Sequence, residues 1–112
     1  MHDNLSSTFQ AMSDPARRAI LRQLAGGTAS VGELARPLDL TAPAVSHHLK
    51  VLERAGLVSR RAVGQHRYIT LEPGRLREAA GWLDDLKRFW GESFDRLEAE
   101  LAAGEGDGNG NG

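Results

Sequence analysis

The stretch from 30 to 71 constrains the fold more than any other part of the chain. It holds two short helix patterns, a tight link between them, and then two strand-like segments, 57–62 and 66–71, joined around Gly64 and Gln65. A helix pair followed by a two-stranded ribbon is the layout of a winged helix-turn-helix. The sequence therefore predicts a mostly α fold with a small β-hairpin wing.

Further helix signals surround this stretch. A short helix is expected over 5–12, and Asp14-Pro15 marks the start of the next one. One long pattern over 75–103, with apolar residues stepping by three and four, predicts a C-terminal dimerisation helix. We expect one DNA-binding and dimerisation domain, 1–103, followed by a disordered Gly-rich tail, 104–112, with no specific role.

The second helix of the pair has two faces. Thr41 is its expected N-cap, and Val45, Leu49 and Leu52 form a buried stripe at helical spacing. Residues on the opposite side, on the flanks and on the wing form the candidate DNA-binding set. This set is Thr41, Ala42, Pro43, Ser46, His47, His48, Lys50, Arg54, Arg60, Arg61, Gln65, His66 and Arg67.

The residue types in this set suit DNA. Small residues at the helix start let it enter a major groove about 12 Å wide, where Ser46 and His47 can reach base edges or phosphates. Lys50 and Arg54 lie one turn apart and can reach the backbone, and the wing adds phosphate or minor-groove contacts. Segment 41–71 carries five Lys or Arg against one acid, whereas the rest holds nine basic and fourteen acidic residues. The net charge of −1 therefore hides a basic region.

Two alternatives stay open at this level. His48 adjoins the buried Leu49, so its ring is equally compatible with DNA contact and with a partly buried position bonded to the body. Lys50 and Arg54 could also form an ordinary solvated face. The cap, the apolar stripe and the wing together favour the DNA interpretation.

The apolar stripe of the C-terminal helix is too long and wide for one small core. We expect it to pack in a homodimer, against the N-terminal helix and its symmetry mate. The alternative is an aromatic pocket for an apolar inducer such as a lipid. The expected interface residues are Leu5, Phe9, Leu83, Leu86, Phe89, Trp90, Phe94, Leu97 and Leu101.

Composition excludes several other classes. There are no cysteines, which removes disulfides, thiolate metal sites and cysteine nucleophiles. No signal peptide and no run of about 20 apolar residues is visible, so a cytoplasmic protein without membrane contact is expected. The sequence has no Gly-rich phosphate loop and no catalytic constellation, and neighbouring Ser46 and His47 point away from each other. We therefore expect no enzyme, no catalytic residues and no cofactor.

The segment 45–71 closely resembles ArsR-type winged-helix repressors. It carries their Ser-x-His-Leu-x-x-Leu-x-x-Ala-Gly-Leu-Val pattern from Ser46 to Val58, and 13–27 resembles their opening helix. The resemblance covers about 5–101. It implies a homodimeric bacterial or archaeal transcriptional regulator that binds double-stranded DNA at an inverted-repeat operator, often in its own promoter.

The sequence departs from the metal-sensing members of that family. Those place Cys-x-Cys on the helix that here spans 31–38, or Asp/His clusters on the terminal helix, which here has acids but no histidine. We therefore expect the metal-independent, autorepressor-like branch. A ligand- or metal-gated repressor and a winged-helix protein-interaction module are the alternatives. The sequence does not identify the operator, the regulated genes or any small-molecule inducer.

Overall fold

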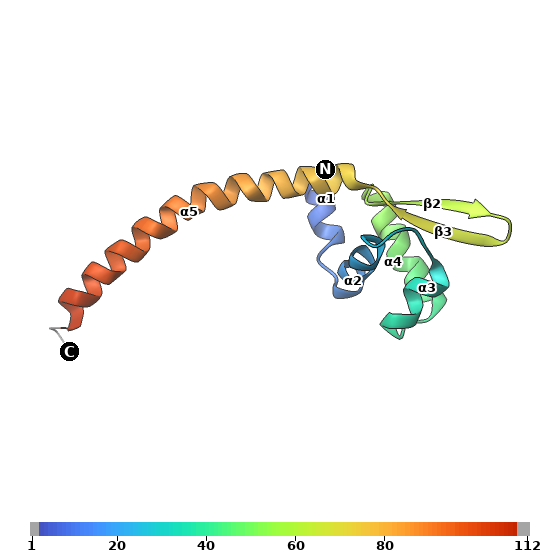
Figure 1. Ribbon diagram of the computed structural model, residues 1–112, viewed down its shortest axis with the longest axis horizontal. Helices are drawn as coiled ribbons and strands as arrows, with labels where there is room; N and C mark the ends of the chain where they lie inside the picture. Colours follow the sequence, from blue (N-terminus) through green and yellow to red (C-terminus); the bar gives the residue numbers. More distant parts are fainter. Residues whose placement is uncertain (1–2, 110–112) are drawn as a thin grey trace. The chain divides into compact units, whose positions relative to one another are not determined.

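The computed structural model describes residues 3–109, with side chains described up to Gly104. The chain divides into two units after Ala79. Its elements, most of them labelled in Figure 1, confirm the predicted mostly helical winged helix-turn-helix. They are α1 (Asn4–Ala11), α2 (Pro15–Leu24), β1 (Ala29–Ser30), α3 (Val31–Ala35), the 3-10 helix η1 (Arg36–Leu38), α4 (Ala42–Arg54), β2 (Val58–Val63), β3 (His66–Leu71) and α5 (Pro73–Asn109).

Side-chain caps fix where the helices begin. The Asp14 carboxylate accepts a backbone N–H at the start of α2. Ser30 and Glu33 exchange hydrogen bonds of 3.0 and 3.2 Å at the start of α3, and the Thr41 hydroxyl caps α4. Each acceptor satisfies an N–H that has no partner within its helix. The three starts predicted from local sequence are therefore confirmed.

A three-stranded antiparallel sheet of order β1-β3-β2 lies beside these helices. Strands β2 and β3 form the wing, and the direct pairing of Val63 with His66 leaves a two-residue loop. Gly64 has φ +62° whereas Gln65 has no positive φ, as in a type II′ hairpin turn. The sequence did not predict β1, which is only two residues long and pairs with β3.

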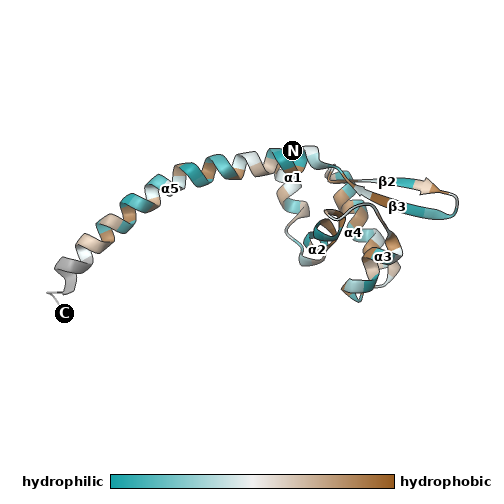
Figure 2. Cartoon of the chain, viewed as in Figure 1, coloured by the Kyte–Doolittle hydropathy of each residue, from teal (hydrophilic) through white to brown (hydrophobic). Residues whose placement is uncertain are grey.

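The core of the first unit is formed where the helices meet the base of the wing. Figure 2 shows hydrophobic residues at the base of β3 and hydrophilic ones towards its tip. The largest fully buried side chains are Ile20, Leu34, Val45, Leu49, Leu52, Leu57, Ile69 and the hydroxyl-bearing Thr8. The Thr8 hydroxyl donates to the Asn4 carbonyl at 2.8 Å, which satisfies the one buried polar side chain among the described residues.

Helix α5 is longer than the sequence predicted at both ends. It begins at Pro73 rather than Arg75, because proline is favourable in a first helical turn, where its missing N–H costs nothing. It also extends past Ala103, where the Gly-rich tail was expected to begin, up to Asn109. The remaining tail residues, 110–112, lie outside the described residues.

Candidate DNA-binding surface

Helix α4 is amphipathic, as its sequence indicated. Val45, Leu49 and Leu52 are fully buried, which holds the helix to the body. On the opposite side His47 and Lys50 are exposed, as the roughly 100° rotation per residue requires. Thr41, Ala42 and Pro43 are exposed at the N-terminal end. This helix end has the small, uncovered surface that major-groove entry needs.

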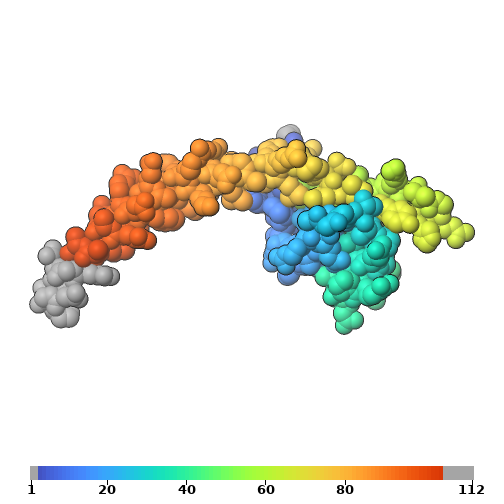
Figure 3. All heavy atoms as spheres, viewed as in Figure 1, coloured from blue at the N-terminus to red at the C-terminus, as the bar shows by residue number. Residues whose placement is uncertain are grey.

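The wing lies beside α4, and in Figure 3 its yellow atoms extend beyond the helical body. Half-buried Ser46 of α4 lines one hollow together with residues of the wing, β1 and α3. Those residues are Ser30, Val31, Gly32, Gln65, His66 and Arg67. The structure therefore brings the helix and the wing tip of the predicted set together.

The basic residues of the wing differ from one another. Arg61 and Arg67 are exposed, but Arg60 is half-buried and its Nη2 lies 3.6 Å from Oε2 of Glu53 on α4. Arg60 pairs across the strands with the buried Ile69, and directly paired residues point to the same face of a sheet. Arg60 therefore faces the body, where its charge is already partly compensated.

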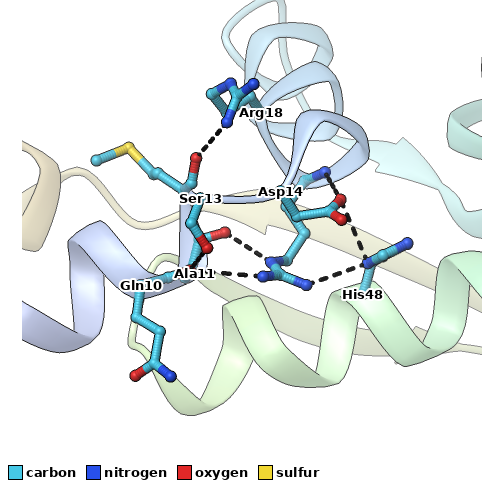
Figure 4. A network of polar contacts seen from close by, with 8 residues as sticks. Gln10, Ala11, Ser13, Asp14, Arg18 and His48 are labelled. Carbon is cyan, nitrogen blue, oxygen red and sulfur yellow. Dashed lines mark hydrogen bonds and ion pairs between the residues drawn. The ribbon is translucent and has the colours of Figure 1, made fainter.

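His48 is held by the body of the protein. Its Nδ1 lies 3.4 Å from an Nη1 of Arg17 and 3.8 Å from Oδ2 of Asp14, both at the start of α2 (Figure 4). Only 18% of its side chain is exposed. Of the two alternatives that the sequence left open for His48, the geometry matches the partly buried position bonded to the body.

Asp14 supplies the carboxylate that lies near the His48 ring. The backbone N–H of Arg17 donates to it at 3.1 Å and holds the pKa of Asp14 below its ordinary value of 3.8. Partial burial opposes this shift, while the nearby His48 and the Arg17 guanidinium add to it. Asp14 therefore stays ionised and negative beside the histidine at neutral pH.

Arg54 is exposed in the last turn of α4. It also lines a hollow where α4 meets α1 and α2. The other lining residues are Ser7, Gln10, Ala11, Arg17, Val51 and Ala55. Lys50, one turn earlier on α4, is likewise exposed.

The predicted dimer residues fall into two groups. Leu5 and Phe9 of α1 are half-buried, as is Leu86 of α5. The remaining positions on α5 are large apolar side chains that the chain itself leaves exposed, with Phe89 reaching 67%. These exposed positions are Leu83, Phe89, Trp90, Phe94, Leu97 and Leu101.

Sequence reasoning missed two residues that organise this surface, Arg17 and Glu53. Each holds a member of the predicted set, His48 and Arg60 respectively, through a contact between different elements. The alternation of β2 against buried Ile69 could have indicated that Arg60 points inward. No comparable signal marks Arg17.

The described part of the chain shows neither a metal-binding cluster nor a membrane-spanning helix. Within residues 3–109, no group of three or more His, Cys, Asp or Glu side chains is arranged to hold a metal ion. No helix of the described range combines the length and apolar character that a membrane span requires.

Comparison with known proteins agrees with the fold. A helix-turn-helix domain family model matches residues 12–61. The chain is 46% identical over 99 residues to the HTH-type transcriptional regulator Rv2034 of Mycobacterium tuberculosis, covering 88% of this chain and 89% of that protein. It is 35% identical over 79 residues to the transcriptional repressor SdpR of Bacillus subtilis, covering 70% and 88%.

The crystal structure of an ArsR family transcriptional regulator, RHA00566, superposes with a TM-score of 0.72. That protein is 34% identical, and the match covers 79% of this chain and 97% of the other. Fold and surface thus define a winged helix-turn-helix DNA-binding protein. The chain belongs to the ArsR family of transcriptional regulators.

Proposed function

We propose that this regulator is a homodimeric repressor that binds an inverted-repeat operator, including one in its own promoter. The observation that carries the proposal is the shared hollow of Ser46 and the wing residues Gln65 to Arg67, beside the exposed end of α4. A groove-entering helix with a basic hairpin next to it can contact base edges and backbone together. The name of the relative SdpR, a transcriptional repressor, supports repression.

The proposal divides the DNA-binding set by task. His47 is exposed on the side of α4 that would face the groove, and half-buried Ser46 precedes it. In this proposal, both side chains contact base edges. Exposed Lys50, Arg61 and Arg67 have open positive charges and would contact phosphates. Each neutralised phosphate releases counterions, so the affinity falls steeply with salt.

The exposed apolar side chains of α5 support a dimer. A contiguous exposed apolar surface on a small protein marks an interaction site, because leaving it in water is unfavourable. Leu83, Leu86, Trp90 and Phe94 together line one groove along the helix. A second copy of this helix offers the same surface, and a two-fold dimer matches the two-fold symmetry of an inverted repeat.

We further propose that this regulator has no classical metal-sensing site. The chain has no cysteine, and its four histidines lie at positions 2, 47, 48 and 66, none of them on α5. Carboxylates alone make a poor transition-metal site. Equilibrium dialysis with zinc and with nickel tests this point, and tight stoichiometric binding of either ion would contradict it.

Fluorescence anisotropy tests the proposed operator. The protein is titrated against the DNA immediately upstream of its own gene and against a scrambled control, each at two salt concentrations. Tight, salt-sensitive binding that prefers the upstream DNA supports autoregulation. Equal weak binding to both DNAs would move the operator elsewhere, and no binding at low salt would refute the DNA-binding function.

A further inference from the structure

Arg17 connects three helices through one side chain. Its Nε donates to the Ala11 carbonyl at 2.6 Å and its Nη2 to the Gln10 carbonyl at 3.5 Å, both in the last turn of α1. Its Nη1 lies 3.4 Å from Nδ1 of His48 on α4, while its own backbone belongs to α2 (Figure 4). The guanidinium therefore sits at the point where the α1–α2 corner meets the recognition helix.

The contact with His48 has a defined direction. An arginine side chain can only donate, so Nδ1 of His48 is the acceptor in a hydrogen bond between the two side chains. The same Nδ1 lies 3.8 Å from the Asp14 carboxylate. The nitrogen nearest to the body thus accepts from Arg17, and the Asp14 carboxylate lies close to the same atom.

The two adjacent histidines consequently lie in different surroundings. Their positions differ by about 100° around the helix axis. His47 is exposed, whereas His48 is half-buried and bonded to α2. Sequence alone placed both in the DNA-binding set, and only the first has the open position that a base contact needs.

We propose that Arg17 and His48 form a positioning pair that sets how the recognition helix is presented to DNA, without touching a base or a phosphate. The pair fixes α4 against the α1–α2 corner, so its loss loosens the placement of every DNA contact on α4 at once. The inference rests on the proposed operator-binding function.

The test compares variants on the DNA that the wild-type protein enriches from a random double-stranded library. His48→Ala and Arg17→Ala each weaken binding about tenfold, as expected for loss of one charge-assisted hydrogen bond. Their enriched sequence and their salt slope stay those of the wild type. The double variant is little weaker than either single one, and His48→Gln recovers part of the loss because its amide oxygen accepts from Arg17. The matched control His47→Ala changes the enriched sequence instead.

Several outcomes would overturn the proposed role of Arg17 and His48. A changed base preference in His48→Ala would make His48 a base reader, and a salt slope smaller by about 0.9 would make it a phosphate contact. Fully additive losses for the two single variants would show that the residues act independently.

A second measurement needs no DNA, so it separates failure of the pair from failure of the proposed function. Urea unfolding of the wild type, His48→Ala, Arg17→Ala and the double variant gives a double-mutant cycle. The pair predicts that the double variant is less destabilised than the sum of the single variants, and strict additivity refutes it. If the wild-type protein enriches no sequence while the cycle shows coupling, the operator-binding function fails and the contact stands only as a stabilising one.

Discussion

Gly56 ends the recognition helix in a backbone conformation that other residues adopt only at a cost. Its φ is +76°, its N–H donates to the Glu53 carbonyl, and the next N–H, of Leu57, donates to the Leu52 carbonyl. These two bonds form a Schellman motif, and the side chains of Leu52 and Leu57 are both fully buried. The turn thus sets both the end of α4 and the entry into the wing.

We predict that Gly56→Ala lowers the free energy of unfolding by about 2 kcal/mol. Of this, roughly 1–2 kcal/mol comes from placing a Cβ in the left-handed region. The remainder is steric, because the new Cβ would lie 2.8 Å from Nε of Arg75 and 3.3 Å from its Cδ and Cζ. The Arg75 side chain has to move, which costs up to about 1 kcal/mol of packing.

Two further variants separate these contributions. Gly64 also has a left-handed φ, +62°, but a Cβ there would meet nothing within 4 Å. Gly64→Ala therefore loses only the backbone part, about 1 kcal/mol. In an Arg75→Ala background, Gly56→Ala should also lower the free energy of unfolding by only about 1 kcal/mol. Urea unfolding at one fixed protein concentration measures all of these differences. If Gly56→Ala and Gly64→Ala lower the free energy of unfolding equally, and Arg75→Ala changes neither loss, the steric contribution is refuted. If Gly56→Ala leaves the free energy of unfolding unchanged, the backbone contribution is refuted as well.

Three further predictions concern charge and assembly. Arg61→Ala lowers the slope of log affinity against log salt concentration by about 0.9. Arg60→Ala lowers this slope clearly less, because the charge of Arg60 already faces Glu53. Equal slopes for the two variants would contradict the inward position of Arg60. Because the folded-state pKa of Asp14 lies below 3.8, its carboxylate stabilises the fold above that pH, and this stabilisation is lost as the pH falls through the folded-state pKa. Asp14→Asn keeps an N-cap acceptor and should show a smaller loss of stability in urea unfolding between about pH 5 and pH 2.5. Trp90→Ser places a polar side chain in the exposed apolar stripe of α5 and shifts the protein towards monomer in analytical ultracentrifugation. An unchanged mass would argue against a dimer interface on this stripe.

Local sequence signals predicted most of the fold. The caps at Asp14, Ser30 and Thr41 depend on hydrogen bonds within one helical turn, and the Val45, Leu49, Leu52 stripe follows from helical spacing. Signals of this kind need no knowledge of distant residues. These features can therefore be predicted from the sequence alone.

Contacts between distant segments were not readable in this way. Strand β1 is two residues long, and it exists because Ala29 and Ser30 pair with β3 across the sheet. The Arg17–His48 contact joins residues on two helices that are 31 positions apart. The position of His48 beside the buried Leu49 left both a DNA contact and a contact with the body open, and only the fold shows the guanidinium beside it.

In the proposed dimer, two copies of α4 related by a two-fold axis read two half-sites of one operator. Selection of bound sequences from a random double-stranded DNA library by the wild-type protein tests it most directly. A two-fold dimer is expected to enrich an inverted repeat with half-site centres about 10–11 bp apart, or farther apart if the DNA bends or the wings set the span. Enrichment of a single unrepeated site, or of no sequence at all, would contradict it.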